Sequence, residues 1–364
     1  MMNKKEFMEY VKNNVKEYLP PAYESAQIDI QEVTKTNDQH KTGITIRKEG
    51  ETITPNIYLD SLYDDYKRGK SIDSIVGEVA DTRIETDNPE MGNVRETLLN
   101  YEELKERLQI RLCDPNLNRE RLERAVYSMM GDFAATYHVN LFQGDDGNAS
   151  VMVTPRLMES WQITKEQLHV DAMIADRSQG PVFQSMSNVL DNLMSGAPVE
   201  NLLDSSMDFN VDMMMPAPMM VLSNQNKMFG ASMMMQQDVM DQIGEMMKGD
   251  YYILPSSVHE IIVIPMNMEM ELPELNAMVS DINATEVEND EVLTNKVQVY
   301  DCKEHAVVNA VAYEKAHVKE QDKADEKSAK SIHERLGEKA SEVKEKAASA
   351  IPTMKKEKTA EAAL

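Results

Sequence analysis

The stretch GDYYILPSSVHEIIVIP, residues 249–265, is the part of the sequence around which the rest of the fold can be placed. Two apolar runs, 251–254 and 261–264, flank a polar corner of sequence PSS. The runs are rich in Ile, Val and Tyr, which favour strands. Neither run alternates apolar with polar side chains, so both faces of each run need cover. The stretch therefore predicts two adjacent strands at the centre of a sheet.

The composition indicates a large acidic globular protein. The chain has 364 residues, and its apolar fraction of 41% is enough for a sizeable core. The net charge of −25 repels phosphate backbones and anionic membrane surfaces, because nucleic-acid binding depends on Lys and Arg displacing counterions. We therefore expect neither nucleic acid nor a membrane among the partners.

Three absences point to a reducing compartment. The chain has two cysteines, Cys113 and Cys302, which is too few for a disulfide framework at this length. The N-terminal sequence MMNKKEFMEYVKNNV lacks the apolar core of a signal peptide. No window approaches the ~18 apolar residues of a membrane span. These features predict a cytoplasmic protein.

Residues 1–90 predict a small α+β unit. Apolar residues at helical spacing predict a helix over 3–19, and short alternating runs predict strands around Ile28, Ile44 and Ile57. Pro55 cannot donate to a strand ladder, so the third strand should lie at a sheet edge. Two helices should follow over 59–66 and 71–84, the second capped by Ser71.

Residues 91–313 predict a larger α+β body with a mixed sheet, and residues 314–364 a charged tail that is disordered or partly helical. In the body, helices are expected over 93–108, 116–124, 186–194, 237–247 and 272–282, and on both sides of Trp161, with Thr164 capping the later one. Strands are expected over 109–112, 126–142, 149–153, 181–184, 219–222, 231–235, 297–299 and 306–311.

The chemically capable side chains of the central stretch are Ser256, Ser257, His259 and Glu260. Of these, Ser257, His259 and Glu260 are the candidate catalytic residues. Adjacent strand residues point to opposite faces, so a site would need partners such as His138, His169 or Asp132. The alternative is that the serines satisfy turn backbone groups and the histidine bonds locally. The sequence carries no phosphate-loop, dinucleotide, zinc or nucleophile-elbow motif, and we expect no cofactor and no metal.

Methionine is unusually frequent. The chain has 29 methionines, and 13 of them fall within residues 207–247. Thioethers fill cores and loops, form adaptable binding surfaces, or bind soft metals such as Cu(I). The segment lacks the His- or Cys-bearing Met-x-x-Met pattern of copper sites. We therefore expect these methionines to fill the core and loops or to form a surface for a partner protein.

Five stretches carry a resemblance to a known family: YYILPSSVHEIIVIP at 251–265, NIYLDSLYDDYKRGKSIDSIV at 56–76, DFAATY at 132–137, the segment around Trp161, and MVLSN at 220–224. They resemble a family of uncharacterised proteins from gut Firmicutes, domain of unknown function 5688. The match spans nearly all of residues 1–313 and leaves the tail outside. The departures are the Met-rich loop and Gly131-Asp132. The resemblance implies bacterial relatives and supplies no catalytic residues.

Two functional hypotheses follow. The first is a non-catalytic protein-interaction or accessory module that binds another protein through the Met-rich region 207–247 or the C-terminal tail. The second is a hydrolase-like enzyme with a site near the turn from Ser256 to Glu260. The sequence alone assigns neither a substrate nor an oligomeric state.

Overall fold

The computed structural model describes residues 1–51, 54–87, 94–144, 147–204, 219–266 and 270–317. Within these residues the strands form three antiparallel sheets, and helices accompany each sheet. The predicted α+β class is therefore confirmed. Residues 1–310 form one compact unit and residues 311–364 a second; the predicted boundaries near residues 90 and 313 stay predictions. No helix in the described part of the chain is long and apolar enough to cross a membrane.

The N-terminal sheet has the strand order β1-β2-β3, with β1 at Gln27–Thr34, β2 at His40–Arg47 and β3 at Asn56–Tyr58. As predicted, β3 is an edge strand that begins directly after Pro55. Three helices pack with it: α1 (Lys4–Asn14), α2 (Leu59–Lys67) and α3 (Ile72–Glu85). Short 3-10 turns complete the unit: η1 (Val15–Tyr18), η2 (Pro21–Tyr23) and η3 (Thr36–Asp38).

Local chemistry explains where these helices begin. The Asn3 side chain accepts from the backbone N–H of Glu6, and the Glu6 carboxylate accepts from that of Asn3, which completes a capping box for α1. Ser71 caps α3 through the backbone N–H of Ser74. The apolar residues of these helices bury against β2 in one cluster that includes Phe7, Val11, Ile44, Ile46, Ile75 and Val79.

The central stretch forms the middle of a six-stranded sheet of order β13-β12-β10-β11-β9-β8. Strands β10 (Tyr251–Leu254) and β11 (Ile261–Pro265) pair antiparallel, as predicted. Their neighbours are β12 (Gln298–Asp301) and β9 (Met220–Asn224). The outer strands are β13 (Ala306–Asn309) and β8 (Pro181–Ser185). The connection between the central strands is six residues long, 255–260, and Ser257 forms an isolated bridge with Val292.

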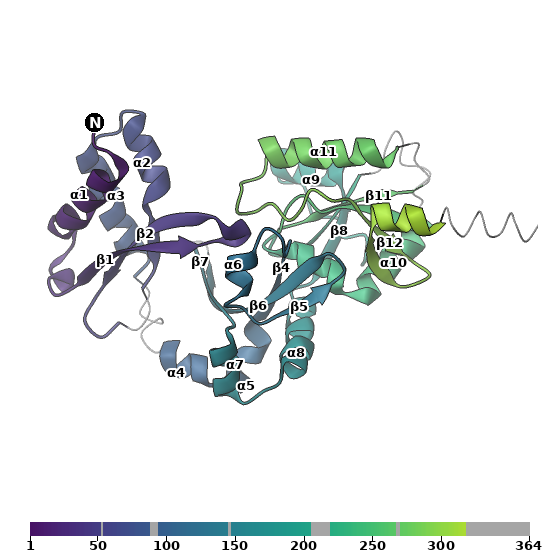
Figure 1. The fold of residues 1–364 in the computed structure, drawn as a ribbon, viewed down its shortest axis with the longest axis horizontal. Coiled ribbons are helices and arrows are strands. Elements are labelled where there is room, and N and C mark those ends of the chain that lie inside the picture. Colours follow the sequence, from purple (N-terminus) through teal and green to yellow (C-terminus); the bar gives the residue numbers. More distant parts are fainter. Residues whose placement is uncertain (52–53, 88–93, 145–146, 205–218, 267–269, 318–364) are drawn as a thin grey trace, which may run out of the picture. The chain divides into compact units, whose positions relative to one another are not determined.

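Both faces of this sheet are covered, which explains why its central strands do not alternate. In Figure 1 the helices α9 (Met186–Ser195) and α11 (Leu272–Thr285) lie on one face of the sheet, and α10 (Gln237–Met247) lies on the other. Tyr251, Ile253, Ile261 and Val263 are fully buried on the α10 side, in the largest hydrophobic cluster of the described residues.

The third sheet has the order β4-β6-β5, and β7 also pairs with β6. Its strands are β4 (Leu108–Cys113), β5 (Tyr127–Met130), β6 (Phe133–Gly144) and β7 (Gly147–Met152). One face carries Leu108, Ile110, Phe133, Tyr137 and Val139 into the same large cluster. The opposite face carries Gln109, Arg111, Thr136 and His138, and it forms the floor of the site described below.

The remaining helices flank these sheets. They are α4 (Val94–Leu99), α5 (Tyr101–Leu104), η5 (Lys105–Arg107), α6 (Arg119–Leu122), α7 (Pro155–Trp161) and α8 (Lys165–Ser178). Thr164 caps α8 through the N–H of Gln167, as predicted. Trp161 is buried, packs on Tyr101 at 5.2 Å and donates to the Leu98 carbonyl at 2.7 Å.

The structure corrects three predicted elements. Residues 231–235 do not form a strand but lie in the 3-10 helix η7 (Gly230–Met235), in which all residues except Met235 are buried. The predicted strand 126–142 is a hairpin of two strands, β5 and β6, because Gly131 takes a φ of +51° in a two-residue turn. The predicted helix 93–108 breaks at Asn100, whose backbone is extended.

Candidate functional site

The predicted residues of the central turn face two different environments. Ser256, Ser257 and Glu260 line a cavity of about 580 Å³ between the sheet and the helices α9 and α11. Most of its other lining side chains are apolar. The Ser257 Oγ accepts a hydrogen bond from the backbone N–H of His259 at 3.0 Å, as in an ordinary turn. A catalytic role for Ser257, His259 and Glu260 stays a prediction.

His259 instead turns toward Phe229 on the opposite side of the connection. Its Nδ1 accepts from the backbone N–H of Phe229 at 3.1 Å, and the two rings lie 5.1 Å apart. Its Nε2 lies 3.4 Å from a carboxylate oxygen of Glu291. Phe229 has a φ of +56°, a conformation that is uncommon for a bulky residue and needs support from its surroundings. His259 therefore holds Phe229 in place.

The ring of Phe229 lies against the guanidinium of Arg111, a residue that lines a second cleft. The distance from the guanidinium carbon to the ring centroid is 3.7 Å, a close cation–π contact. Arg111 also donates from Nε to Gln109 Oε1 at 3.1 Å and from Nη2 to Ser150 Oγ at 2.8 Å. These contacts fix the direction of the guanidinium and are all to uncharged groups.

A second arginine enters the cleft from the short helix α6. Arg121 Nη2 lies 3.4 Å from His138 Nε2. The helix is anchored from the N-terminal sheet: the Asp38 carboxylate accepts from the backbone N–H groups of Glu120 and Arg121 at 2.9 and 3.1 Å. Asn37 and Asn118 exchange hydrogen bonds of 2.7 and 2.9 Å beside it. The tip of the β1–β2 hairpin thereby sets the position of Arg121.

Burial changes the pKa values of the polar groups in this cleft. Loss of solvent, followed by the neighbouring charge of Arg121, lowers the pKa of Arg111 to about 9, so it stays protonated at neutral pH. Burial also lowers the pKa of Arg121. His138 is buried, and burial together with the two arginines lowers its pKa well below the usual value. The histidine is therefore neutral at pH 7.

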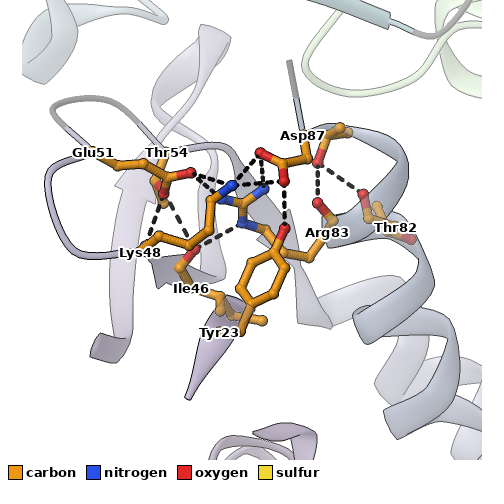
Figure 2. A network of polar contacts seen from close by, with 9 residues as sticks. Tyr23, Ile46, Lys48, Glu51, Thr54, Thr82, Arg83 and Asp87 are labelled. Carbon is orange, nitrogen blue, oxygen red and sulfur yellow. Dashed lines mark hydrogen bonds and ion pairs between the residues drawn. The ribbon is translucent and has the colours of Figure 1, made fainter. Parts of the chain in front are cut away.

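In the described part of the chain, Arg111 and Arg121 combine burial with the lack of an ion pair, although the carboxylate of Asp38 acts on the pKa of Arg121 in the opposite direction to burial. Among the described residues, neither guanidinium forms an ion pair, although Asp and Glu outnumber Lys and Arg by 63 to 38 over the whole chain. Arg83 behaves in the opposite way. Figure 2 shows its guanidinium between Glu51 and Asp87, with ion-pair distances of 2.6 and 3.7 Å. The charges of that network are matched, and it offers an anion no free cation.

The arginine cleft, as we call it, has a volume of about 460 Å³. Its floor is the polar face of the β4-β6-β7 sheet with Arg111, His138 and Ser150. One wall is α6. The other is the N-terminal sheet, with residues 31–34 of β1, the following Lys35, and Asn56 and Tyr58 of β3. At the rim Glu120 is held by Thr34 at 2.9 Å and by Arg124 at 3.7 Å. The cleft can therefore bind an anionic group on its positive floor.

Sequence reasoning named His138 only as a possible partner of His259 and missed both arginines. A weak signal was present: Gln109 and Arg111, and Thr136 and His138, occur at alternate positions of predicted strands and so mark a polar sheet face. No sequence pattern indicated that α6 and β1 lie against that face. These segments are up to about a hundred residues away from it along the chain.

Other candidate features have ordinary explanations in the described residues. Met220, Met233, Met234, Met240 and Met247 are buried in the large cluster, while residues 207–218 lie outside the description. No group of three or more His, Cys, Asp or Glu side chains in the described part is placed to hold a metal ion. Cys113 and Cys302 are both free thiols.

Comparison with known proteins gives one result. Neither a search of curated proteins nor a search of solved structures returned a match. A family model described as "Family of unknown function (DUF5688)" matches residues 4–302, which is most of the chain and includes both clefts. The resemblance noted in the sequence is confirmed at the level of the family, and the bacterial source stays an expectation. The chain belongs to the DUF5688 family.

Proposed function

We propose that this protein is a non-catalytic binding module whose arginine cleft takes an anionic group of its ligand. The single observation that carries the proposal is the presence of two partly buried guanidinium groups, Arg111 and Arg121, with no ion-pair partner among the described residues. Charged groups away from water are normally paired, because an uncompensated one costs several kcal/mol. Unpaired buried charges are therefore expected where the binding of an oppositely charged ligand offsets their cost.

The chemistry of the floor supports anion binding rather than bond cleavage. Arg111 is directed by Ser150 and Gln109, and the guanidinium fork suits bidentate contacts with carboxylate or phosphate oxygens. The Thr136 hydroxyl donates to the Arg111 carbonyl at 2.9 Å, so its proton is already committed. Of the two hydroxyls, that of Ser150 orients the Arg111 guanidinium and that of Thr136 bonds the backbone.

The test is the effect of an anion on thermal unfolding. Inorganic phosphate should raise the melting temperature of the protein in a saturable way, since a ligand that binds only the native state adds RT ln(1 + [L]/Kd) to its stability. In the Arg121→Gln protein this increase should disappear. Sodium chloride at matched ionic strength separates specific binding from general screening.

Arg119→Gln is the matched control. Arg119 lies on the same helix α6, is exposed, and does not line the cleft, so the substitution makes an identical change in net charge. The Arg119→Gln protein should keep the phosphate effect. Equal phosphate effects in the Arg121→Gln and Arg119→Gln proteins would contradict the proposal.

A further inference from the structure

Strand β1 borders the arginine cleft with its edge as well as with one face, across which the Gln31 side chain donates to Asn56 Oδ1 of β3 at 2.7 Å. Residues 31–35 all line the cleft, although successive side chains of a strand point to opposite faces. Glu32 and Thr34 project from the opposite face to Gln31 and Val33, so the cleft reaches around the outer edge of β1. β1 is also the first strand of the order β1-β2-β3 and pairs on one side only, with β2.

The hydrogen-bond pattern shows which backbone groups lie on that edge. The N–H of Lys35 donates to the Gln39 carbonyl at 2.7 Å, so Lys35 faces β2, and the alternation of an antiparallel ladder gives Val33 and Gln31 the same direction. The Thr45 hydroxyl donates to the Asp29 carbonyl, which agrees with this phase. The N–H and C=O groups of Glu32 and Thr34 therefore point away from β2, toward the cleft.

Two unlike features thus lie side by side in one cleft. One is a row of strand backbone groups, which recognises another extended chain by adding it to the sheet. The other is the unpaired cation pair of Arg111 and Arg121, which recognises an acidic group. A small free anion would use only the second feature. An extended peptide with an acidic side chain uses both.

From this juxtaposition we propose that the ligand is an extended peptide segment of a partner protein, which adds a strand to the free edge of β1 and places an Asp or Glu carboxylate on Arg111 and Arg121. This inference rests on the proposed function, because it specifies the ligand of the same cleft. A single carboxylate suits a protein of net charge −25 better than a multiply charged ligand, which the surrounding field would repel more strongly.

The experiment uses fluorescent pentapeptide libraries and the full-length protein. The parent library has Asp at its centre, mixed Ala, Val, Thr and Gln at the flanks, and blocked ends. Three companion libraries carry Asn, phosphoserine, or Asp with N-methylated flanking amides. Binding is measured by fluorescence anisotropy, and displacement by acetate and inorganic phosphate is measured with the same samples.

The protein variants separate the backbone from the charge. Glu32→Pro removes the edge N–H, whereas Glu32→Ala removes the same exposed side chain and keeps the N–H. The parent library should bind at least ~10-fold more tightly than the Asn and N-methylated libraries. Glu32→Pro should weaken parent binding by a similar factor, while Glu32→Ala should not. The phosphate-induced melting shift should survive in both variants.

Several outcomes would overturn the inference. Equal binding of the N-methylated and parent libraries would show that β1 adds no strand. Binding of the phosphoserine library without the Asp library would show that the acidic side chain is misassigned. If no library binds and phosphate still stabilises the protein through Arg121, the peptide inference fails and the proposed function stands. If phosphate has no Arg121-dependent effect, both fail.

Discussion

Asp176 is a carboxylic acid buried completely inside the protein, where α8 packs on β4. Its Oδ1 accepts from the backbone N–H of Ile110 at 3.2 Å, and its Oδ2 has no hydrogen-bond partner in the described structure. Burial raises the pKa of Asp176 to about 7, above the ~3.9 of an unfolded aspartate. The native state thus holds this proton more tightly than the unfolded state does.

This difference predicts a pH dependence with a definite sign. Between about pH 4 and pH 7 the native carboxyl is protonated and the unfolded one is not, so the free energy of unfolding falls as pH rises, by up to about 1.4 kcal/mol per pH unit. Asp176→Asn removes this loss and keeps the acceptor for Ile110. The stability of the variant minus that of the natural protein, measured by urea unfolding, should increase from pH 4 to pH 7. A difference that is constant over this range would contradict the prediction.

His259 is expected to matter for the arginine cleft although it does not line it. His259→Ala removes the acceptor of the Phe229 N–H and with it the support for the ring that lies on Arg111. The loss of one hydrogen bond, about 1 kcal/mol, should weaken phosphate binding about fivefold. Calorimetric titration measures this change. The control is His305→Ala, at an exposed histidine paired with Asp241, and this variant should bind phosphate normally. Equal phosphate affinities of the two variants would show that His259 does not support the arginine cleft.

At the scale of elements, the strand pair β10–β11 determines the body of the protein. Val263 is fully buried and faces the large cluster, whereas its neighbour Ile262 is half-buried and lines the cavity beneath α9 and α11. The two residues are adjacent in sequence and similar in chemistry, but they point to opposite faces of the sheet. They therefore form a natural matched pair for a test of the fold.

The Val263→Asp protein should fail to fold. The substitution loses about 1.5–3 kcal/mol of apolar burial and adds an unpaired buried charge, which together approach the ~5–15 kcal/mol stability of a domain. Ile262→Asp should still give a cooperative melting transition, at a lower temperature, because its carboxylate reaches solvent. Circular dichroism melting curves distinguish the two. Cooperative unfolding of the Val263→Asp protein would mean that β11 does not lie at the centre of the sheet.

The elements that could be predicted are those with a strong local signal. The apolar runs on either side of a turn predicted β10 and β11. The capping residues Ser71 and Thr164 predicted where α3 and α8 begin, and Pro55 predicted that β3 is an edge strand. The failures have local causes as well. The run at 231–235 is apolar enough for a strand but forms η7, because a short continuous apolar run has no periodicity that distinguishes a buried strand from a buried helix.

At the scale of the whole molecule, the candidate site could not be predicted, because it depends on contacts between distant segments. Arg111 and Arg121 are only ten positions apart, but what makes them a site is that neither guanidinium forms an ion pair within the described ranges of the chain. That absence depends on where every carboxylate of the folded chain comes to lie. The sequence predicted only an acidic protein, in which a buried arginine such as Arg83 is expected to pair with carboxylates, as it does with Glu51 and Asp87.

Arg111 and Arg121 should receive an anion that Arg83 does not. Side-chain Nε–Hε resonances of a protein labelled with ¹⁵N-arginine report on each guanidinium directly, with Arg→Lys variants for assignment. During a phosphate titration, the Arg111 and Arg121 signals should shift together along one saturation curve, and the Arg83 signal should stay in place. Signals of Arg111 and Arg121 that do not move, or that move no more than that of Arg83, would show that the arginine cleft binds no anion.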